Sequence, residues 1–231
     1  MKKIAIIPAR GGSKRILRKN IKFFLGEPII SYAIRTALTS SLFDEVMVST
    51  DDEEIAEIAL KYGANVPFLR SNSNSKDTST TIDVISEVIF NYKQLGVNFD
   101  YTCCIYPCAP FINKEMLLSS FMKLDSNNLD CIFPVIKYGH PIQRALQIVK
   151  KNKIEMINPE NMQTRTQDLE PTFHDLGQFY FFKTDVIVSN NKLWNENTGF
   201  IELKEMESHD IDTIDDWEIA EFKFKYLNKI R

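Results

Sequence analysis

The 231-residue chain lacks any apolar run of the roughly 18 residues that a membrane-spanning helix needs. Two lysines and a short apolar run open the sequence, but Arg10 follows where a secretory signal would carry its cleavage site. Cysteines are few, four in all, and they lie between positions 103 and 131 without the paired C-x-x-C spacing of a metal site. We therefore expect a cytoplasmic protein whose thiols stay reduced and mostly buried.

An excess of positive charge is also missing. Lys and Arg total 28 and Asp and Glu total 31, which gives a net charge of −3. A protein that wraps a nucleic acid normally carries a clear positive excess, so we expect no nucleic-acid partner and no membrane partner. With 44% hydrophobic residues, the chain can bury the core of one large soluble domain.

Short apolar runs alternate with helical periodicity along the chain. The run 4–7 is typical of a strand buried on both faces, and apolar residues between 29 and 38 repeat at helical spacing. Further strands are predicted at 46–48, 66–69, 101–106, 131–136 and 177–182, and further helices at 55–62, 82–92, 117–124 and 214–227. Capping boxes are predicted at 50–53 and 80–83. This alternation predicts an α/β fold with a mostly parallel sheet covered on both faces.

The alternation breaks between about residues 137 and 176. This stretch holds three of the nine prolines and two hairpin-like pieces around Ile148 and Ile154. We interpret it as an insertion that leaves the sheet.

The most informative segment is the basic loop, residues 10–22, which holds six of the 28 Lys and Arg residues and no acid. It follows the first predicted strand, and ligands of parallel sheets bind beyond the carboxyl ends of the strands. Gly11 and Gly12 allow the backbone to approach a ligand and to turn its N–H groups toward an anion. Arg and Lys side chains bind phosphate oxygens. The loop therefore predicts a phosphate site, and the alternative is a solvated basic turn, although six like charges repel without an anion.

The usual phosphate-binding motifs are absent. Neither G-x-x-x-x-G-K-[ST] nor G-x-G-x-x-G occurs, which argues against P-loop kinases, ATPases and dehydrogenases. There is no G-x-S-x-G elbow of a serine hydrolase, and the three histidines form no metal pattern.

The string that begins Ile7-Pro8-Ala9-Arg10-Gly11-Gly12-Ser13-Lys14 and ends Lys19-Asn20 resembles the signature of the cytidylyltransferases that activate nine-carbon sugar acids, the CMP-sialic acid synthetase relatives. Further similar segments lie at 49–56, 62–64, 70–81 and 209–213. The segments 106–111, 141–145 and 174–180 resemble the pseudaminic acid branch most. Sialic acid enzymes usually carry a glutamine where Tyr106 stands. Two departures from the branch are Leu17 in place of a proline and Cys108 in place of a small hydroxyl residue.

This resemblance implies a three-layer, Rossmann-like nucleotide-diphospho-sugar transferase fold over residues 1–231. It implies that about 137–176 form an inserted subdomain for dimerisation and for covering the sugar, and that the protein is a homodimer. The implied reaction is attack of the anomeric hydroxyl of a nine-carbon sugar acid on the α-phosphorus of CTP, which releases pyrophosphate. The resemblance favours pseudaminic acid as this sugar acid. The CMP-sugar would serve the glycosylation of surface glycans or flagellin. CMP-sialic or CMP-legionaminic acid synthesis, a metal-dependent glycosyltransferase and a non-catalytic nucleotide-binding protein remain alternatives.

The resemblance also assigns the nucleotide end of the site. Arg10 and Lys19 are expected to stabilise the α-phosphate and the leaving group. The expected nucleotide-binding residues are Ala9, Arg10, Gly11, Gly12, Ser13, Lys14, Asn20, Arg70, Thr80 and Thr81. For Thr80 and Thr81, capping of a helix is an equally good explanation.

Asp210 and Asp212 are two residues apart, so in an extended segment both carboxylates point the same way. Such a pair suits Mg²⁺ carried in by a triphosphate, and the resemblance favours this role. The alternative is that Asp212 and Thr213 only cap the final helix.

The expected sugar-binding residues share neutral hydrogen-bonding groups or a guanidinium that suits a carboxylate. They are Tyr106, Gln143, Arg144, Arg165, Gln167, Gln178 and Tyr180. The alternative for each is an ordinary surface or subunit-contact role.

Overall fold

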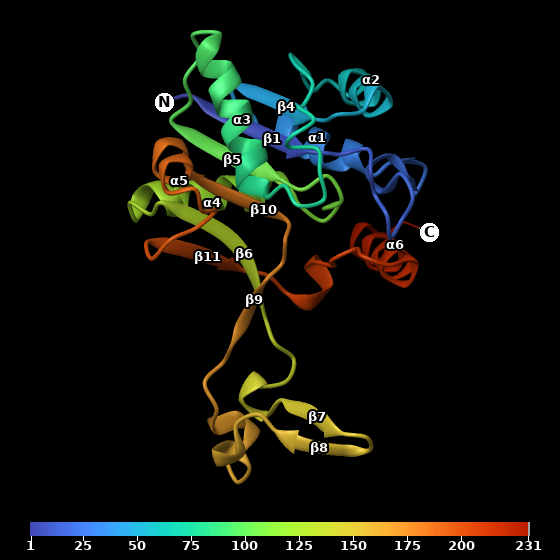
Figure 1. The fold of residues 1–231 in the computed structure, drawn as a ribbon, viewed down its shortest axis with the longest axis vertical. Helices are drawn as coiled ribbons and strands as arrows, with labels where there is room; N and C mark the ends of the chain where they lie inside the picture. The colour runs from blue at the N-terminus through green and yellow to red at the C-terminus, as the bar shows by residue number, and fades with distance from the viewer. Residues whose placement is uncertain (231) are drawn as a thin grey trace.

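The computed structural model describes residues 1–230, which form one large sheet between two layers of helices (Figure 1). The main strands are β1 (Lys3–Pro8), β4 (Glu45–Ser49), β5 (Tyr101–Ile105), β6 (Cys131–Lys137), β9 (Phe173–Asp175), β10 (Phe179–Lys183) and β11 (Thr198–Glu202), with short pairs β2 (Phe23–Phe24) and β3 (Glu27–Pro28), and β7 (Leu146–Lys150) and β8 (Lys153–Met156). The α-helices are α1 (Ile30–Thr39), α2 (Glu53–Lys61), α3 (Thr81–Gln94), α4 (Lys114–Ser126), α5 (Thr184–Asn190) and α6 (Ile214–Asn228). No helix in this described part is both long and apolar enough to cross a membrane.

The sheet confirms the predicted fold class. Its order is β11-β6-β10-β5-β1-β4, with β9 added to β6. β1 runs parallel to β4 and β5, and β6 runs parallel to β11. β10 is antiparallel to both of its neighbours, so the sheet is mostly, not wholly, parallel.

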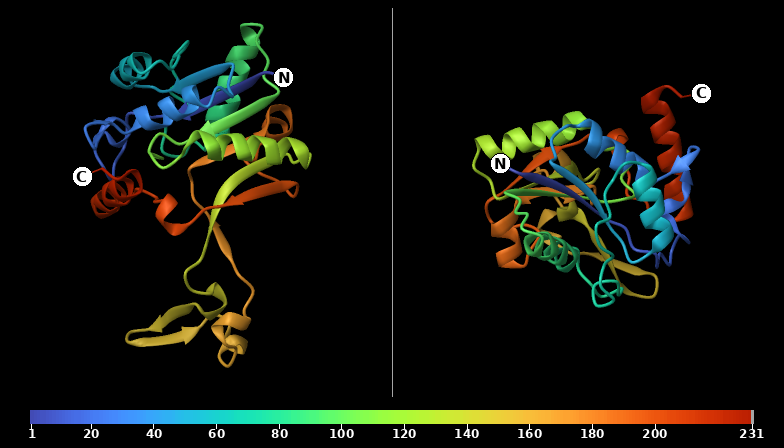
Figure 2. Two further views of the ribbon diagram at one scale, coloured as in Figure 1. Left: turned by 180° about the vertical axis from the view of Figure 1, so that it is seen from behind. Right: turned by 90° about the horizontal axis from the view of Figure 1, so that it is seen from above.

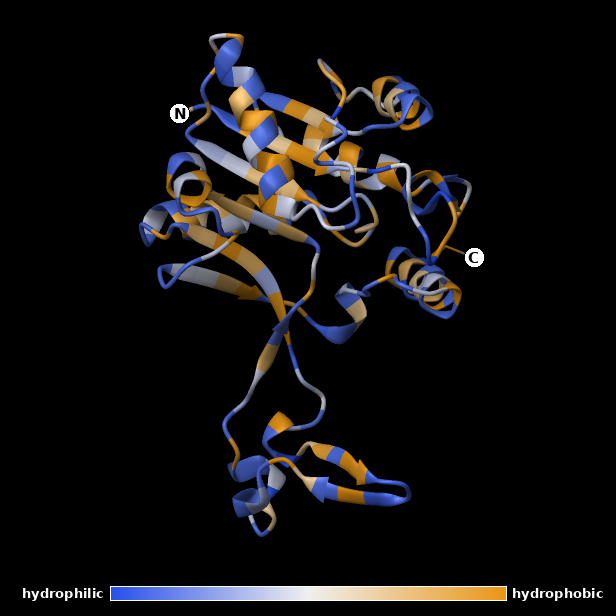
Figure 3. Cartoon of the chain, viewed as in Figure 1, coloured by the Kyte–Doolittle hydropathy of each residue, from blue (hydrophilic) through white to orange (hydrophobic). Residues whose placement is uncertain are grey.

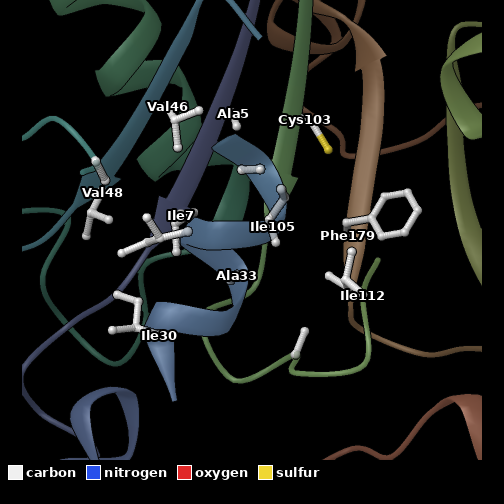
Figure 4. Close-up of a cluster of buried hydrophobic side chains, with 14 of the residues drawn as sticks. Ala5, Ile7, Ile30, Ala33, Val46, Val48, Cys103, Ile105, Ile112 and Phe179 are labelled. Carbon is white, nitrogen blue, oxygen red and sulfur yellow. The ribbon is translucent and has the colours of Figure 1, made fainter. Parts of the chain in front are cut away.

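The continuous apolar run of β1 is explained by burial on both faces. Ala5 and Ile7 pack on the side of α1, α2 and α4, and Ile4 and Ile6 pack on the side of α3 and α5. Figure 4 shows the first of these clusters, where Ile30 and Ala33 of α1 meet the sheet. The view from above in Figure 2 shows the helices on the two sides of the sheet. A third cluster, which includes Trp217, joins the basic loop to α6.

Helix starts follow local capping chemistry. The capping box predicted at 80–83 is present, because Thr80 accepts the Asp83 N–H and the Asp83 carboxylate accepts the Thr80 N–H. The box predicted at 50–53 is wrong. Asp52 is the N-cap of α2 and accepts from the Ile55 N–H at 3.0 Å, two residues later than predicted.

The strand predicted at 66–69 is also wrong. The chain there touches β4 at only one isolated bridge, between Asn65 and Met47, because the backbone turns away at Pro67, which has no N–H to donate. The strand β11 and the helix α5 were not predicted, since their residues show little periodicity.

The insertion leaves the body of the protein between β6 and β9 (Figure 1). β9 pairs antiparallel with β6, so these two segments form the stalk. The hairpin pieces predicted around Ile148 and Ile154 are strands β7 and β8, which pair with each other. Every residue from 137 to 175 remains at least partly exposed, so the insertion has no buried core of its own.

Candidate active site

A cleft of about 520 Å³ opens beyond the carboxyl ends of β1 and β5. This is the edge at which the sequence places the site, because the basic loop leaves the end of β1. Twelve of the residues predicted for the site line the cleft together: Arg10, Ser13, Lys14, Lys19, Asn20, Arg70, Thr80, Thr81, Tyr106, Tyr180, Asp210 and Asp212. The topology thus brings together residues that are up to about 200 positions apart in the sequence.

The basic loop meets acidic partners within the same chain. Arg10 and Lys14 both pair with the carboxylate of Asp77, which lies on the segment before α3. The two cations and their hydrogen bonds keep the pKa of Asp77 below its usual value. Asp77 also lines the cleft, so a triphosphate entering there would meet cations that are already ordered.

A second acidic partner lies on the segment before α6. Asp212 is 2.5 Å from a guanidinium nitrogen of Arg15 and 3.6 Å from Nζ of Lys19. These pairs link the basic loop to the predicted metal pair, so the cations and the carboxylates of the site share one wall of the cleft.

Arg18 fixes the far end of the loop. Its guanidinium forms a two-point contact with Asp52, the N-cap of α2, and lies 2.5 Å from Glu54. The bond from Arg18 lowers the pKa of Asp52, and this effect exceeds the opposing effect of burial. Gly11 crosses close to the same carboxylate, because a Cβ added to it would lie 2.5 Å from an Asp52 oxygen. A larger residue than glycine would therefore displace the loop.

A buried asparagine and a half-buried cysteine hold the start of the loop. Asn20 donates from Nδ2 to the carbonyl oxygen of Arg10 at 2.9 Å. Cys108 donates its S–H to Oδ1 of Asn20 at 3.3 Å. Burial raises the pKa of Cys108 to about 12, so this thiol acts as a hydrogen-bond donor and not as a nucleophile. All four cysteines are free, as predicted.

The carboxylates of Asp210 and Asp212 face the cleft. Partial burial and the neighbouring charge of Asp212 raise the pKa of Asp210, and Lys19 and Arg15 offset only part of this effect. A further cation beside Asp210 would therefore stabilise its ionised form. Thr213, not Asp212, supplies the side-chain cap of α6. No cluster of three or more metal-ligating side chains occurs among residues 1–230. The pair suits Mg²⁺, which typically takes one or two carboxylates and fills its other positions with phosphate oxygens and water.

The cleft is also lined by neutral hydroxyl groups, by Arg70, and by Asn74 and Lys76 of the segment before α3. The Arg70 side chain is buried and donates from Nε to Oγ of Ser49 at 3.0 Å. The hydroxyl groups of Thr81 and Tyr106 are 2.9 Å apart. Thr80 caps α3, so the helix-cap explanation accounts for its bonds. Tyr180 packs edge-on against Tyr106, with ring centroids 6.0 Å apart.

The remaining predicted residues lie outside the cleft lining. Ala9 is buried, and Gly11 and Gly12 lie in the basic loop, where Gly12 is exposed. Gln178 is 2% exposed, and neither its amide oxygen nor its amide nitrogen has a hydrogen-bond partner among residues 1–230. Gln143, Arg144, Arg165 and Gln167 lie on the insertion, away from this chain's own cleft (Figure 1).

The acidic residues that organise the basic loop were missed. Asp77 and Asp52 lie in segments that resemble the family, but no spacing rule connects them to residues 10–18. Only the charge argument could have indicated them, because six cations in one loop require anions, and here those anions belong to the protein itself.

The parallel-rich sheet, the basic loop after β1 and the carboxylate pair beside that loop define a nucleotide-binding α/β protein. The cytidylyltransferase family model matches residues 4–229, and the chain belongs to this family. It is thus a CTP-dependent nucleotidyltransferase.

The chain is 40% identical over 225 residues to a pseudaminic acid cytidylyltransferase of Campylobacter jejuni, with 97% of each protein covered. It is 33% identical to a CMP-N,N'-diacetyllegionaminic acid synthase of Legionella pneumophila, with 99% of this chain and 98% of that protein covered. Among solved structures, a CMP:2-keto-3-deoxy-manno-octonic acid synthetase complexed with CTP superposes with a TM-score of 0.73 at 18% identity, covering 98% of this chain and all of that one. That likeness establishes the shared fold.

Proposed function

We propose that this protein transfers CMP from CTP to the anomeric hydroxyl of pseudaminic acid and releases pyrophosphate. The observation that carries the proposal is the cleft itself, where the basic loop and the carboxylate pair converge beyond β1. The similarity to the Campylobacter enzyme over 97% of both chains supports the choice of sugar acid. The greater distance from the legionaminic acid enzyme makes that substrate the second candidate.

The reaction brings two anions together while negative charge grows on the departing pyrophosphate. Positioning and electrostatic stabilisation therefore supply most of the catalysis. We assign Arg10 and Lys19 to the α-phosphate and the leaving group, since both line the cleft and both are already oriented by carboxylates. Ser13 and Lys14 would hold the outer phosphates, with the backbone of Gly11 and Gly12 behind them.

Asp210 and Asp212 would hold Mg²⁺ together with the triphosphate. The ion supplies charge neutralisation at the phosphates when it is bound. Asp212 pairs with Lys19, and both line the cleft together with Asp210. The metal ion and the Lys19 ammonium group would therefore act on the same part of the nucleotide.

The sugar end is incomplete within one chain. Tyr106 and Tyr180 line the cleft, but the guanidinium groups expected to bind a sugar carboxylate, Arg144 and Arg165, lie on the insertion. The insertion exposes the apolar side chains Ile148 and Ile154 at 82% and 62% of their full surface. Exposed apolar patches of this kind mark interaction sites. We infer that the protein is a homodimer in which the insertion of one protomer covers the site of its partner.

The test is a pyrophosphate-release assay with CTP and, in turn, pseudaminic, legionaminic and sialic acids. Turnover is expected with pseudaminic acid and CTP, and not with the other nucleotides. Arg10→Ala and Lys19→Ala are each expected to lower kcat by about 10- to 150-fold, because each removes a charged hydrogen bond of about 1.5–3 kcal/mol from the transition state.

Lys22→Ala is the matched control, since Lys22 belongs to the same loop but lies over the Trp217 ring, 5.3 Å from its centroid, outside the cleft lining. Its turnover is expected to stay within about threefold of the wild type. Wild-type turnover in both Arg10→Ala and Lys19→Ala would contradict the assignment. Release of a nucleoside diphosphate from a nucleotide sugar would indicate a glycosyltransferase instead.

A further inference from the structure

Asp175, the last residue of β9, holds the hydroxyl group of Tyr180. The Tyr180 hydroxyl donates its hydrogen to one carboxylate oxygen of Asp175. The other oxygen accepts the backbone N–H of Gly177 at 2.8 Å. Tyr180 is only 6% exposed, and it lines the cleft together with Gly177. Both bonds of the carboxylate thus fix the cleft wall at the point where the chain returns from the insertion.

These bonds set the hydrogen-bond polarity of Tyr180. An ionised carboxylate only accepts hydrogen bonds, and a phenol has a single hydrogen to donate. Since that hydrogen is directed at Asp175, the phenol oxygen can offer only its lone pairs to any other group. Burial and the Asp175 carboxylate both raise the pKa of Tyr180, so the hydroxyl keeps its proton across the working pH range.

We propose that Asp175 is a positioning residue that holds Tyr180 as a hydrogen-bond acceptor for a hydroxyl or amide N–H group of the sugar acid. The inference rests on the proposed function and adds a specificity rule to it. A carboxylate or phosphate oxygen cannot bind Tyr180 in this state, because two acceptors would face each other. The sugar must therefore present a donor here and turn its carboxylate toward cations elsewhere.

The place of Tyr180 in the cleft agrees with this polarity. Its ring lies against Tyr106, whose hydroxyl is 2.9 Å from that of Thr81. The cations that line the cleft belong to the basic loop, to Arg70 at the end of β4 and to Lys76 on the segment before α3. Neutral donor groups of the sugar would thus bind near Tyr180, and the anionic phosphates of CTP would bind near the cations of the basic loop.

The test is a double-mutant cycle read out by steady-state kinetics with CTP and pseudaminic acid. Tyr180→Phe and Asp175→Ala are each expected to lower kcat/KM for the sugar acid by about 3- to 12-fold, the loss of one neutral hydrogen bond. The double variant should be no worse than Tyr180→Phe alone, because both changes remove the same interaction. The KM for CTP should stay within about twofold, which a general disruption of the cleft would not allow.

Asp175→Asn gives a sharper result. Its amide oxygen can accept from Gly177, which leaves the amide nitrogen to donate to Tyr180 and turns the phenol hydrogen toward the cleft. It should lose at least as much kcat/KM for the sugar acid as Asp175→Ala, although its shape is nearly that of the wild type. Asp185→Asn, an equal change of charge on α5 outside the cleft lining, should behave as the wild type.

Full sugar-acid kcat/KM in Asp175→Asn, or additive losses in the double variant, would overturn the role of Asp175 while leaving the proposed function intact. Failure of the wild type to use any sugar acid would overturn the proposed function, and this role of Asp175 with it. Should Asp175→Ala not fold, Tyr180→Phe and Asp175→Asn still decide the matter.

Discussion

Five of the six cationic side chains in the basic loop have a carboxylate partner within the described part of the chain. The sequence predicts that these charges need anions, and we expected those anions to belong to a ligand. The protein instead orders its cations before substrate arrives, which lowers the cost of reorganisation during the reaction. This residue-scale arrangement could not be read from spacing, since Asp77, Asp52 and Asp212 are separated from the loop by long stretches of chain.

Asp210 shows the opposite arrangement, a carboxylate that its surroundings disfavour. Partial burial and the charge of Asp212 raise its pKa above the ordinary 3.8, so the ionised form is less stable in the folded than in the unfolded chain. Above that raised pKa the charge lowers the stability of the fold, and this loss disappears as the pH falls and Asp210 takes up a proton.

We therefore predict that Asp210→Asn is more stable than the wild type at about pH 7 in the absence of divalent cations, by about 0.5 kcal/mol, since solvent still screens part of the charge. The gain should shrink toward zero at low pH, and turnover should be lost at every Mg²⁺ concentration. Urea unfolding at two pH values, with chelator present, measures the difference. If Asp210→Asn were no more stable than the wild type at neutral pH, the inference that the ionised Asp210 destabilises the metal-free fold would be wrong.

At the scale of helices and strands, patterns with strong local causes were predictable. β1 and β5 were found from continuous apolar runs, and α3 from its capping box together with its buried face. The wrong predictions concern segments in which tertiary contacts determine where a helix begins or whether a strand forms. α2 begins at Asp52 because the carboxylate there is also held by Arg18, and the run 66–69 fails as a strand because only one bridge reaches β4.

The start of α2 supports a prediction on stability. Asp52 caps the helix and pairs with Arg18. The exposed fraction of the side chain is 22% for Asp52 and 32% for Arg18. Asp52→Ala should lower the free energy of unfolding by about 1–2 kcal/mol, the usual range for a lost cap, and Asp52→Asn should lose less because asparagine also caps. Urea unfolding measures both, with Glu57→Gln on the exposed face of α2 as the control.

The pH dependence of this contribution follows from the lowered pKa of Asp52. Its stabilisation is fully present above the ordinary value of 3.8 and is lost as the pH falls through the lowered value. Asp52→Asn should therefore lose less stability than the wild type on acidification below that point. Parallel acid-unfolding curves for the two proteins would show that Arg18 does not hold this carboxylate in solution.

At the scale of the whole molecule, most residues predicted for the nucleotide end lie together in one cleft, whereas those predicted for the sugar end do so only in part. Arg10 and Asp212 belong to compact motifs, one directly after β1 and the other directly before α6, and the fold brings both to one cleft. Gln143 and Arg165 belong to an insertion whose position depends on what it packs against. Its fold within one chain offers no buried surface that would fix that position.

This absence of a core leads to a prediction about assembly. Strands β7 and β8 carry both apolar and polar side chains (Figure 3), yet the apolar ones, such as Ile148, remain exposed in the isolated chain. A two-stranded hairpin is marginal in water without a surface to cover it. We predict that sedimentation equilibrium gives twice the chain mass of 26.7 kDa for the wild type, and that Ile148→Glu shifts it toward a monomer.

The monomer produced by Ile148→Glu should separate the two ends of the site. CTP binding is expected to stay within about threefold of the wild type, because the basic loop and the carboxylate pair come from one chain. The melting temperature is expected to stay near that of the wild type, because the main core is untouched. Turnover with the sugar acid should fall by about 10-fold or more, since each lost charged contact to a substrate carboxylate is worth about 1.5–3 kcal/mol. Leu95→Glu, the same kind of change at another exposed apolar residue, the C-cap of α3, should remain dimeric and active. A monomeric wild type with full turnover would show that one protomer completes its own sugar site, with the insertion folding back over the cleft.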